Sequence, residues 1–186
     1  KKGVNVICPI GELAGADVPA LPPAILGVIK NPDVYGVFDV GGDDVGATVL
    51  GRFKPYLYEG VYNLFFVVNA NRPFTGSVEG IIKYLADIQK VTRLNITALV
   101  NNTNLGLETG LNTIVKGHKM ISQVAQKLNI PIAFVTALRA VAGDVEKTLN
   151  VKVLPLDLHM QPPWNYDGDL ISNNPGVYKE KFFCRD

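Results

Sequence analysis

Residues 62–69, Tyr62-Asn-Leu-Phe-Phe-Val-Val-Asn69, decide the fold class of this chain. Every position from Leu64 to Val68 is apolar, where a strand with one wet face would alternate apolar and polar residues. An unbroken apolar run of this kind is typical of a parallel sheet that is covered on both faces. We therefore expect this segment to form a central strand.

Strand and helix patterns alternate on both sides of this run. Further strands are expected at residues 4–8, 35–40, 95–101, 130–136 and 151–156. Helices are expected at residues 22–30, 47–54, 77–94, 107–129 and 144–149. Ser77 is the expected cap of the third helix, which would carry a Glu79–Lys83 ion pair on its surface. Short links between such elements imply right-handed crossovers, so the sequence predicts an α/β fold with a mostly parallel sheet and helices on both faces.

Composition limits the possible functions. The chain has 186 residues, of which 47% are hydrophobic and 19% charged, as expected for one folded domain. The formal net charge of +1 gives no electrostatic surface for nucleic acid or an anionic membrane. We find no signal peptide or apolar span and expect a cytoplasmic protein. Residues 1–160 are expected to form the α/β domain, and the Pro-, Asn- and Gly-rich residues 161–186 a C-terminal tail.

Ligands of parallel α/β sheets bind beyond the carboxyl ends of the strands, so the loops there are the candidate site. The loop Asp39-Val-Gly-Gly-Asp-Asp44 follows an expected strand. A carboxylate at Asp39 can hold the water shell of Mg²⁺ while the glycines bring the backbone close to a phosphate. Asp43 and Asp44 add two more carboxylates. The alternative is an ordinary strand-ending turn with solvated acids.

Two further loops carry candidate binding residues. Arg72 is the one cation in the loop Asn69-Ala-Asn-Arg-Pro-Phe-Thr75, and it can meet a phosphate, an acidic partner or only solvent. The loop that begins Asn101-Asn-Thr-Asn offers side-chain amides, which carry a donor and an acceptor and suit the edge of an adenine. A guanine site would want a carboxylate there. The alternative is a polar turn whose amides bond their own backbone.

Taken together and in this order, these loops resemble the MinD/ParA/Mrp-like branch of P-loop ATPases. The segments that carry the resemblance are Val37-Phe-Asp-Val-Gly-Gly-Asp-Asp44, Phe66-Val-Val-Asn-Ala-Asn-Arg-Pro73, Ala98-Leu-Val-Asn-Asn-Thr-Asn-Leu-Gly106 and Ile130-Pro-Ile-Ala-Phe-Val-Thr136.

The resemblance implies a three-layer P-loop-like fold that binds ATP and Mg²⁺. It implies that Asp39 is the metal-binding and catalytic residue. The phosphates would lie near Gly41, Gly42 and Asp43. It also implies that Asn101 or Asn102 contacts adenine and that the loop from Thr136 to Arg139 flanks the base.

One element of that family is missing from these residues. The phosphate loop G-x-x-x-x-G-K-[ST] would supply backbone amides and a lysine, but no Gly-Lys dipeptide occurs in the sequence. The expectation is therefore the C-terminal part of an ATP-binding switch protein or ATPase, whose first strand and phosphate loop lie outside this chain. On its own, the chain should bind nucleotide weakly or not at all.

Two alternatives remain open. The first is a non-catalytic module that kept the fold and binds a partner protein or a second copy, for which the aromatic tail around Trp164 and Phe182 is the motivation. The second is a Rossmann-type enzyme for another small ligand. No G-x-G-x-x-G follows an expected strand, which weighs against the Rossmann alternative.

Overall fold

A computed structural model describes residues 3–7, 23–57 and 61–158. The chain divides into two units, of which Asp39–Leu158 contains the whole sheet. The described residues of the other unit, which spans Lys1–Phe38 and His159–Asp186, are 3–7 and 23–38 and include α1 (Pro23–Lys30). The predicted tail at residues 161–186 lies outside the described residues.

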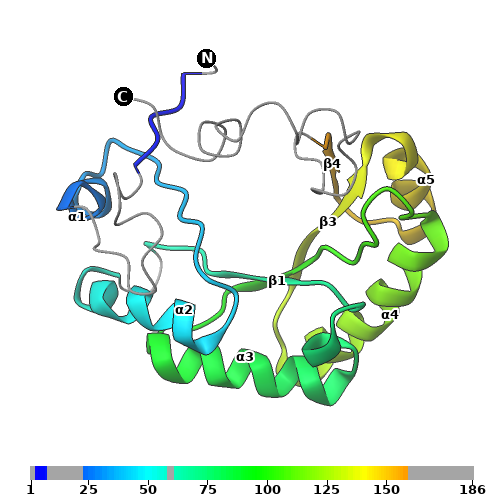
Figure 1. Cartoon of the computed structure of the whole chain (residues 1–186), viewed down its shortest axis with the longest axis horizontal. Helices are drawn as coiled ribbons and strands as arrows, with labels where there is room; N and C mark the ends of the chain where they lie inside the picture. Colours follow the sequence, from blue (N-terminus) through cyan, green and yellow to red (C-terminus); the bar gives the residue numbers. More distant parts are fainter. Residues whose placement is uncertain (1–2, 8–22, 58–60, 159–186) are drawn as a thin grey trace, which may run out of the picture. The chain divides into compact units, whose positions relative to one another are not determined.

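The sheet has four strands in the order β1-β2-β3-β4, and every neighbouring pair is parallel (Figure 1). The strands are β1 (Phe65–Val68), β2 (Ala98–Asn101), β3 (Ile132–Leu138) and β4 (Val153–Leu156). The α/β class and the parallel sheet predicted from the sequence are therefore confirmed. All four strands lie inside or within two residues of segments where strands were expected. The prediction that residues 62–69 form a central strand is wrong for the described sheet, because β1 pairs with β2 alone and lies at its edge.

The crossovers contain three main helices, α3 (Val78–Thr92), α4 (Leu111–Leu128) and α5 (Arg139–Leu149). α3 begins where predicted, because the Ser77 side chain accepts a hydrogen bond from the backbone N–H of Gly80. α3 and α4 end at left-handed residues, Arg93 and Asn129, whose N–H groups bond back to helix carbonyls. Preceding them, α2 (Asp44–Thr48) continues into the 3₁₀ helix η2 (Val49–Tyr56).

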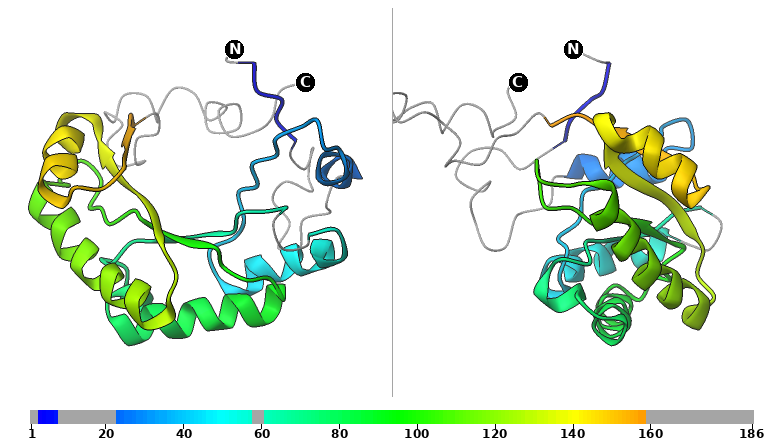
Figure 2. Two further views of the ribbon diagram at one scale, coloured as in Figure 1. Left: turned by 180° about the vertical axis from the view of Figure 1, so that it is seen from behind. Right: turned by 90° about the vertical axis from the view of Figure 1, so that its right-hand side faces the viewer.

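Strand register shows that α3, α4 and α5 pack on the same face of the sheet. Phe66 and Val68 pair with Leu99 and Asn101 of β2, so these four side chains share a face. Phe66, Val68 and Leu99 join one core cluster with Ile81 of α3 and Ile121 of α4. Figure 1 and the reverse view in Figure 2 show the three helices along one side of the strands. The sequence predicted helices on both faces of the sheet. Among the described residues of this unit, helices cover one face.

The opposite face of the sheet is also apolar. It carries Phe65 and Val67 of β1, which pair with Ala98 and Val100 of β2. The Phe65 ring meets Phe134 edge-on at 5.9 Å. Phe65 and Val67 are nevertheless 44% and 56% exposed among the described residues.

Two predicted strands are wrong as drawn from the sequence. Residues 35–40 have strand composition but form no strand, and the same holds for the described residues 4–7 of the strand expected at 4–8. Tyr35 and Val37 are almost fully exposed. A strand is stable only when its backbone groups pair with a neighbour, and neither segment has such a neighbour in the described part of the chain.

Several helix details also differ from the sequence prediction. α4 begins at Leu111 and not at 107, because Gly106 has a positive φ of 63° and Gly110 is the extended N-cap. α5 begins at Arg139, five residues before the expected start. The predicted Glu79–Lys83 ion pair does not form, since Lys83 bonds Asp87 at 2.8 Å while Glu79 lies 3.7 Å from Lys127.

Candidate functional site

The loops after β1 and β2 lie side by side at the carboxyl edge of the sheet. Val68 and Asn101, the last residues of the two strands, are partners in the parallel ladder. The next N–H, that of Asn102, donates to the carbonyl of Val68 at 2.8 Å. This adjacency of the Asn69 and Asn101 strand ends is what the sequence predicted.

Asparagine amides fasten these two loops together. The Asn69 amide donates to the carbonyl of Asn104 at 3.1 Å, and its Oδ1 accepts from the N–H of Asn104 at 3.3 Å. The same Oδ1 accepts from the N–H of Asn71 at 3.0 Å. Both ends of the Asn69 side chain are thus used to hold the loops in position.

Asn101 is a structural residue of the interior. It is fully buried, its amide donates to the carbonyl of Ile114 at 3.4 Å, and its Oδ1 accepts from the N–H of Thr103 at 3.0 Å. Because the side chain is fully buried and both of its ends bond inside the fold, Asn101 presents no polar group to a base. Of the two candidate adenine contacts, the geometry therefore favours Asn102.

Asn102 is half-buried and lies beside Thr136 of β3. Its Oδ1 accepts a hydrogen bond of 2.5 Å from the hydroxyl of Thr136. Its Nδ2 donates no hydrogen bond to any described residue. The Asn102 amide is therefore held through its oxygen and presents an unused donor.

The loop after β1 has a fixed backbone and an exposed cation. The carbonyl of Asn69 accepts from the N–H of Arg72 at 3.1 Å and from the hydroxyl of Thr75 at 2.7 Å. Arg72 itself is exposed. The structure thus places this guanidinium on a constrained loop at the carboxyl edge.

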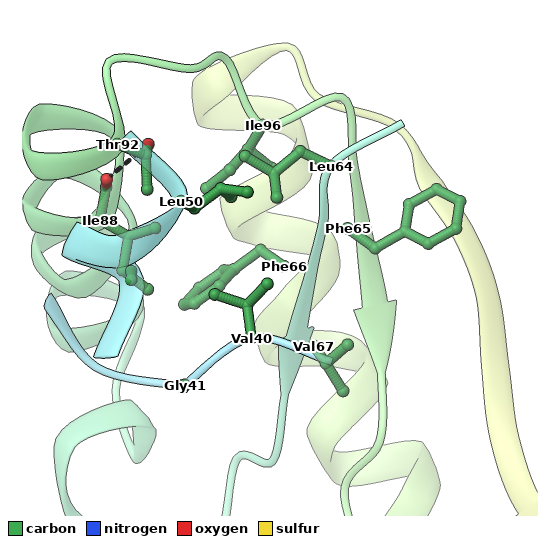
Figure 3. Close-up of a pocket in the computed structure, with 12 residues that line it drawn as sticks. Val40, Gly41, Leu50, Leu64, Phe65, Phe66, Val67, Ile88, Thr92 and Ile96 are labelled. Carbon is green, nitrogen blue, oxygen red and sulfur yellow. Dashed lines mark hydrogen bonds between the residues drawn. The ribbon is translucent and has the colours of Figure 1, made fainter. Parts of the chain in front are cut away.

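The segment from Asp39 to Gly42 runs beside β1 and not at the end of a strand. Val40, Gly41 and Gly42 line a cavity of about 120 Å³ together with residues of β1, among them Phe66 and Val67 (Figure 3). Asp39 is exposed. At Gly41, a Cβ would stand 2.7 Å from the Cα of Gly46, so this turn requires glycine, whereas a Cβ at Gly42 meets open space.

Asp43 is used as a helix cap. Its Oδ1 accepts from the N–H of Gly46 at 2.6 Å at the start of α2. Burial raises the pKa of the Tyr84 hydroxyl, and the nearby charges of Asp43 and Asp44 raise it further. The Tyr84 ring stacks on Phe74 with the ring centres 6.2 Å apart, so the loop after β1 contacts α3 at this tyrosine.

Few side chains near the candidate site could bind a metal ion. No group of three or more His, Cys, Asp or Glu side chains gathers within the described ranges. A Mg²⁺ bound with phosphates keeps most of its water and takes one or two carboxylates from the protein, and the exposed carboxylate of Asp39 can supply one. The residues present thus fit a metal that arrives with a nucleotide better than a resident ion.

Beyond β2, the structure departs from the predicted loop at residues 136–139. Thr136 to Leu138 belong to β3, and Arg139 opens α5. The Arg139 guanidinium holds Asp157, just beyond β4, through two hydrogen bonds of 2.8 and 2.6 Å. The sequence reasoning missed this pair and the contact of Thr136 with Asn102, because the partners are distant in the sequence. Arg139 and Asp157 are 18 positions apart, and Thr136 and Asn102 are 34 positions apart.

Comparison of the chain with family models, with curated proteins and with solved structures found no match. No helix in the described part of the chain is both long and apolar enough to pass through a membrane.

Proposed function

We propose that this chain is part of an ATP-binding switch protein or ATPase of the MinD/ParA/Mrp type. The observation that carries the proposal is the unused amide donor of Asn102 at the carboxyl edge, beside the constrained loop of Arg72. Ligands of parallel sheets bind at this edge, and an asparagine amide matches the edge of adenine. A cytoplasmic location belongs to the same proposal.

In this scheme each candidate residue has a limited task. Asn102 contacts the base, Arg72 meets a phosphate, and Asp39 holds the water shell of Mg²⁺. Gly41 and Gly42 keep side chains away from the terminal phosphate. Bound Mg²⁺ would neutralise phosphate charge. Most contacts to the phosphates would come from a phosphate-binding loop outside these 186 residues, since no Gly-Lys dipeptide occurs among them.

The test uses the chain as it stands. In ¹H–¹⁵N NMR spectra, AMP and Mg-ATP should both shift the backbone signals of Asn102 and Thr136, with dissociation constants on the order of 1 mM. Because the loop that would bind most of the phosphates is missing, the dissociation constants for AMP and Mg-ATP should agree within about threefold. This corresponds to under about 1 kcal/mol of binding free energy. Absence of any shift at these signals up to about 10 mM of either nucleotide, some tenfold above the expected constant, would refute the base contact at Asn102 on which the proposal rests.

Matched variants separate the site from general effects. Asn102→Leu should abolish the shifts, because it removes the proposed base contact. Asn95→Leu makes the same change at an exposed position before β2, at the opposite edge of the sheet, and should leave them unchanged. Equal loss in both variants would also contradict the proposal.

A second candidate function is a non-catalytic protein-interaction module. It is favoured by the exposed apolar side chains of Phe65 and Val67 on the face of β1 that carries no helix of this unit. Parallel strands are normally covered on both faces. Light scattering tests this candidate: a stable dimer whose mass does not respond to nucleotide would support it, and a monomer that binds AMP would not.

A further inference from the structure

β1 has a free backbone edge on the side away from β2, because no other strand in the described part of the chain pairs with it. The carbonyls of Leu64 and Val68 accept hydrogen bonds of 2.9 and 2.8 Å from N–H groups that flank β2. Backbone groups of successive strand residues point to alternate edges. The N–H and C=O groups of Phe65 and Val67 therefore point to the outer edge of β1.

The cavity of about 120 Å³ described above lies along this outer edge (Figure 3). Residues 64–67 line it as four in a row, although successive strand side chains point to opposite faces of the sheet. In Figure 3 the Phe66 side chain points toward Leu50 and Ile88, whereas the Phe65 ring points away from them. Phe65 thus lines the cavity through its backbone, so the cavity reaches the unpaired groups of the edge.

The lining of the cavity is uncharged and mainly apolar, with Ala47, Leu50, Phe66 and Ile88 among its side chains. Residues 61–69 contain no charged residue and no proline, the features by which proteins usually protect a free strand edge from pairing. The volume approaches that of an apolar cavity of roughly 150 Å³ that binds benzene. It therefore suits one aliphatic or small aromatic side chain.

The size and charge of this edge favour one extended segment over a second folded copy. β1 has four residues, so its edge is about 13 Å long at roughly 3.3 Å per residue. A stable dimer buries about 800 Å² on each partner, far more than an edge of that length and one strand wide can supply. Pairing with its N–H and C=O groups requires an extended backbone, and the uncharged lining favours uncharged side chains.

We infer that the outer edge of β1 is a docking site for an uncharged, extended peptide segment that adds a strand to the sheet. In the parallel direction of the sheet, one peptide residue donates its N–H to the carbonyl of Phe65 and accepts from the N–H of Val67. That residue stands opposite Phe66, so its side chain enters the cavity. The backbone bonds supply affinity and the cavity supplies selectivity. This site goes beyond nucleotide binding and does not require it.

The test titrates the ¹⁵N-labelled chain with the blocked peptide acetyl-Lys-Thr-Val-Ile-Val-Thr-Lys-amide, whose lysines lie outside the paired residues and keep it soluble. The N–H signals of Phe65 and Val67 should shift, and hydrogen exchange at Val67 should slow. A matched peptide with an N-methyl group on the isoleucine amide lacks the donor for the Phe65 carbonyl and should bind about fivefold more weakly. Glycine in place of the isoleucine leaves the cavity unfilled and should weaken binding by at least about tenfold.

Three results would overturn the inference. The first is an unchanged Val67 signal up to about 5 mM peptide, roughly fivefold above a dissociation constant of 1 mM. The second is equal binding of the parent and N-methyl peptides, which would show apolar contact without strand pairing. The third is a stable dimer of the chain alone, seen by light scattering, in which the Val67 N–H is already protected from exchange, because a second copy would then occupy the edge.

Discussion

At Gly117, α4 packs directly against Thr103 in the loop after β2. A Cβ on Gly117 would stand 2.6 Å from the Cβ of Thr103, whose hydroxyl in turn accepts from the N–H of Ala70 at 3.3 Å. Thr103 is buried, so neither side chain can move aside freely. We predict that Gly117→Ala lowers the free energy of unfolding by about 1–3 kcal/mol through overpacking.

The matched control for that change is Gly143→Ala in α5. A Cβ at Gly143 meets nothing within 4 Å, and the position is exposed. Alanine favours a helix over glycine by roughly 0.5–1 kcal/mol, so this variant should be neutral or slightly more stable. Urea unfolding of both variants measures the difference. Equal stability of the two variants would show that the approach of α4 to Thr103 is looser than the structure has it.

His118 is a titratable residue that the proposed site does not use. Burial lowers the pKa of its imidazole below the ordinary value of 6.5, and its Nδ1 is buried without a hydrogen bond to any described residue. We predict an NMR titration midpoint below 6.5 for the ring carbon signals that disappear in His118→Gln. A midpoint at or above 6.5 would contradict the burial argument.

The same lowered pKa has a consequence for stability. Between the folded and unfolded pKa values of His118, the unfolded chain binds more protons, so stability rises with pH across that window. The folded state should therefore lose stability as the pH falls below 6.5. Urea unfolding at several pH values in wild type and in His118→Gln measures this, and the variant should show the smaller acid loss. If the variant instead lost more stability at low pH than the wild type, the prediction would be contradicted.

At the scale of elements, the N-cap of α3 can be tested directly. Ser77 accepts from the N–H of Gly80 at 3.0 Å, and α3 carries the core residues Ile81, Leu85 and Ile88. Ser77→Ala should cost about 1 kcal/mol of stability, because a helix N–H loses its partner. Ser77→Asp keeps an acceptor and places a negative charge at the helix start, so it should match the wild type. Chemical unfolding that finds serine and alanine equivalent would show that the cap contributes nothing.

Elements whose signals are local were predictable, and those that depend on distant partners were not. The cap at Ser77 and the apolar run of β1 are signals within a few residues of sequence, and both the cap and a strand were found there. The place of that strand in the sheet depends on distant partners, and β1 lies at the edge of the described sheet instead of its centre. Whether residues 35–40 form a strand depends on a neighbouring strand, which their composition cannot reveal. Lys83 had two acidic residues within helical reach, Glu79 and Asp87, and the sequence did not distinguish between them.

The candidate site was predictable as a region but not residue by residue. Strand–helix alternation places the loops after β1 and β2 at one edge, and the structure has them there. Asn101 and Asn102 are neighbours, yet consecutive strand residues point to opposite faces, so one is buried toward α4 and the other meets Thr136. Which of the two asparagines is buried depends on the exact register of β2 against its neighbours, and the apolar pattern of the sequence does not determine that register.

At the scale of the whole molecule, the unit Asp39–Leu158 holds both hydrophobic clusters of the described residues and all four strands. We predict that a fragment of residues 39–158 folds by itself and unfolds cooperatively, since both clusters are built, among the described residues, from side chains of this unit. Near-ultraviolet circular dichroism with urea unfolding measures this.

Leu99 provides the control for that fragment. It is fully buried at the centre of β2, so Leu99→Ala should destabilise the fragment and the full chain alike by about 2–5 kcal/mol. The exposed Leu107, outside any helix or strand, should tolerate alanine within about 0.5 kcal/mol. A fragment without a cooperative transition, next to a full chain that has one, would mean that the unit requires residues beyond 39–158.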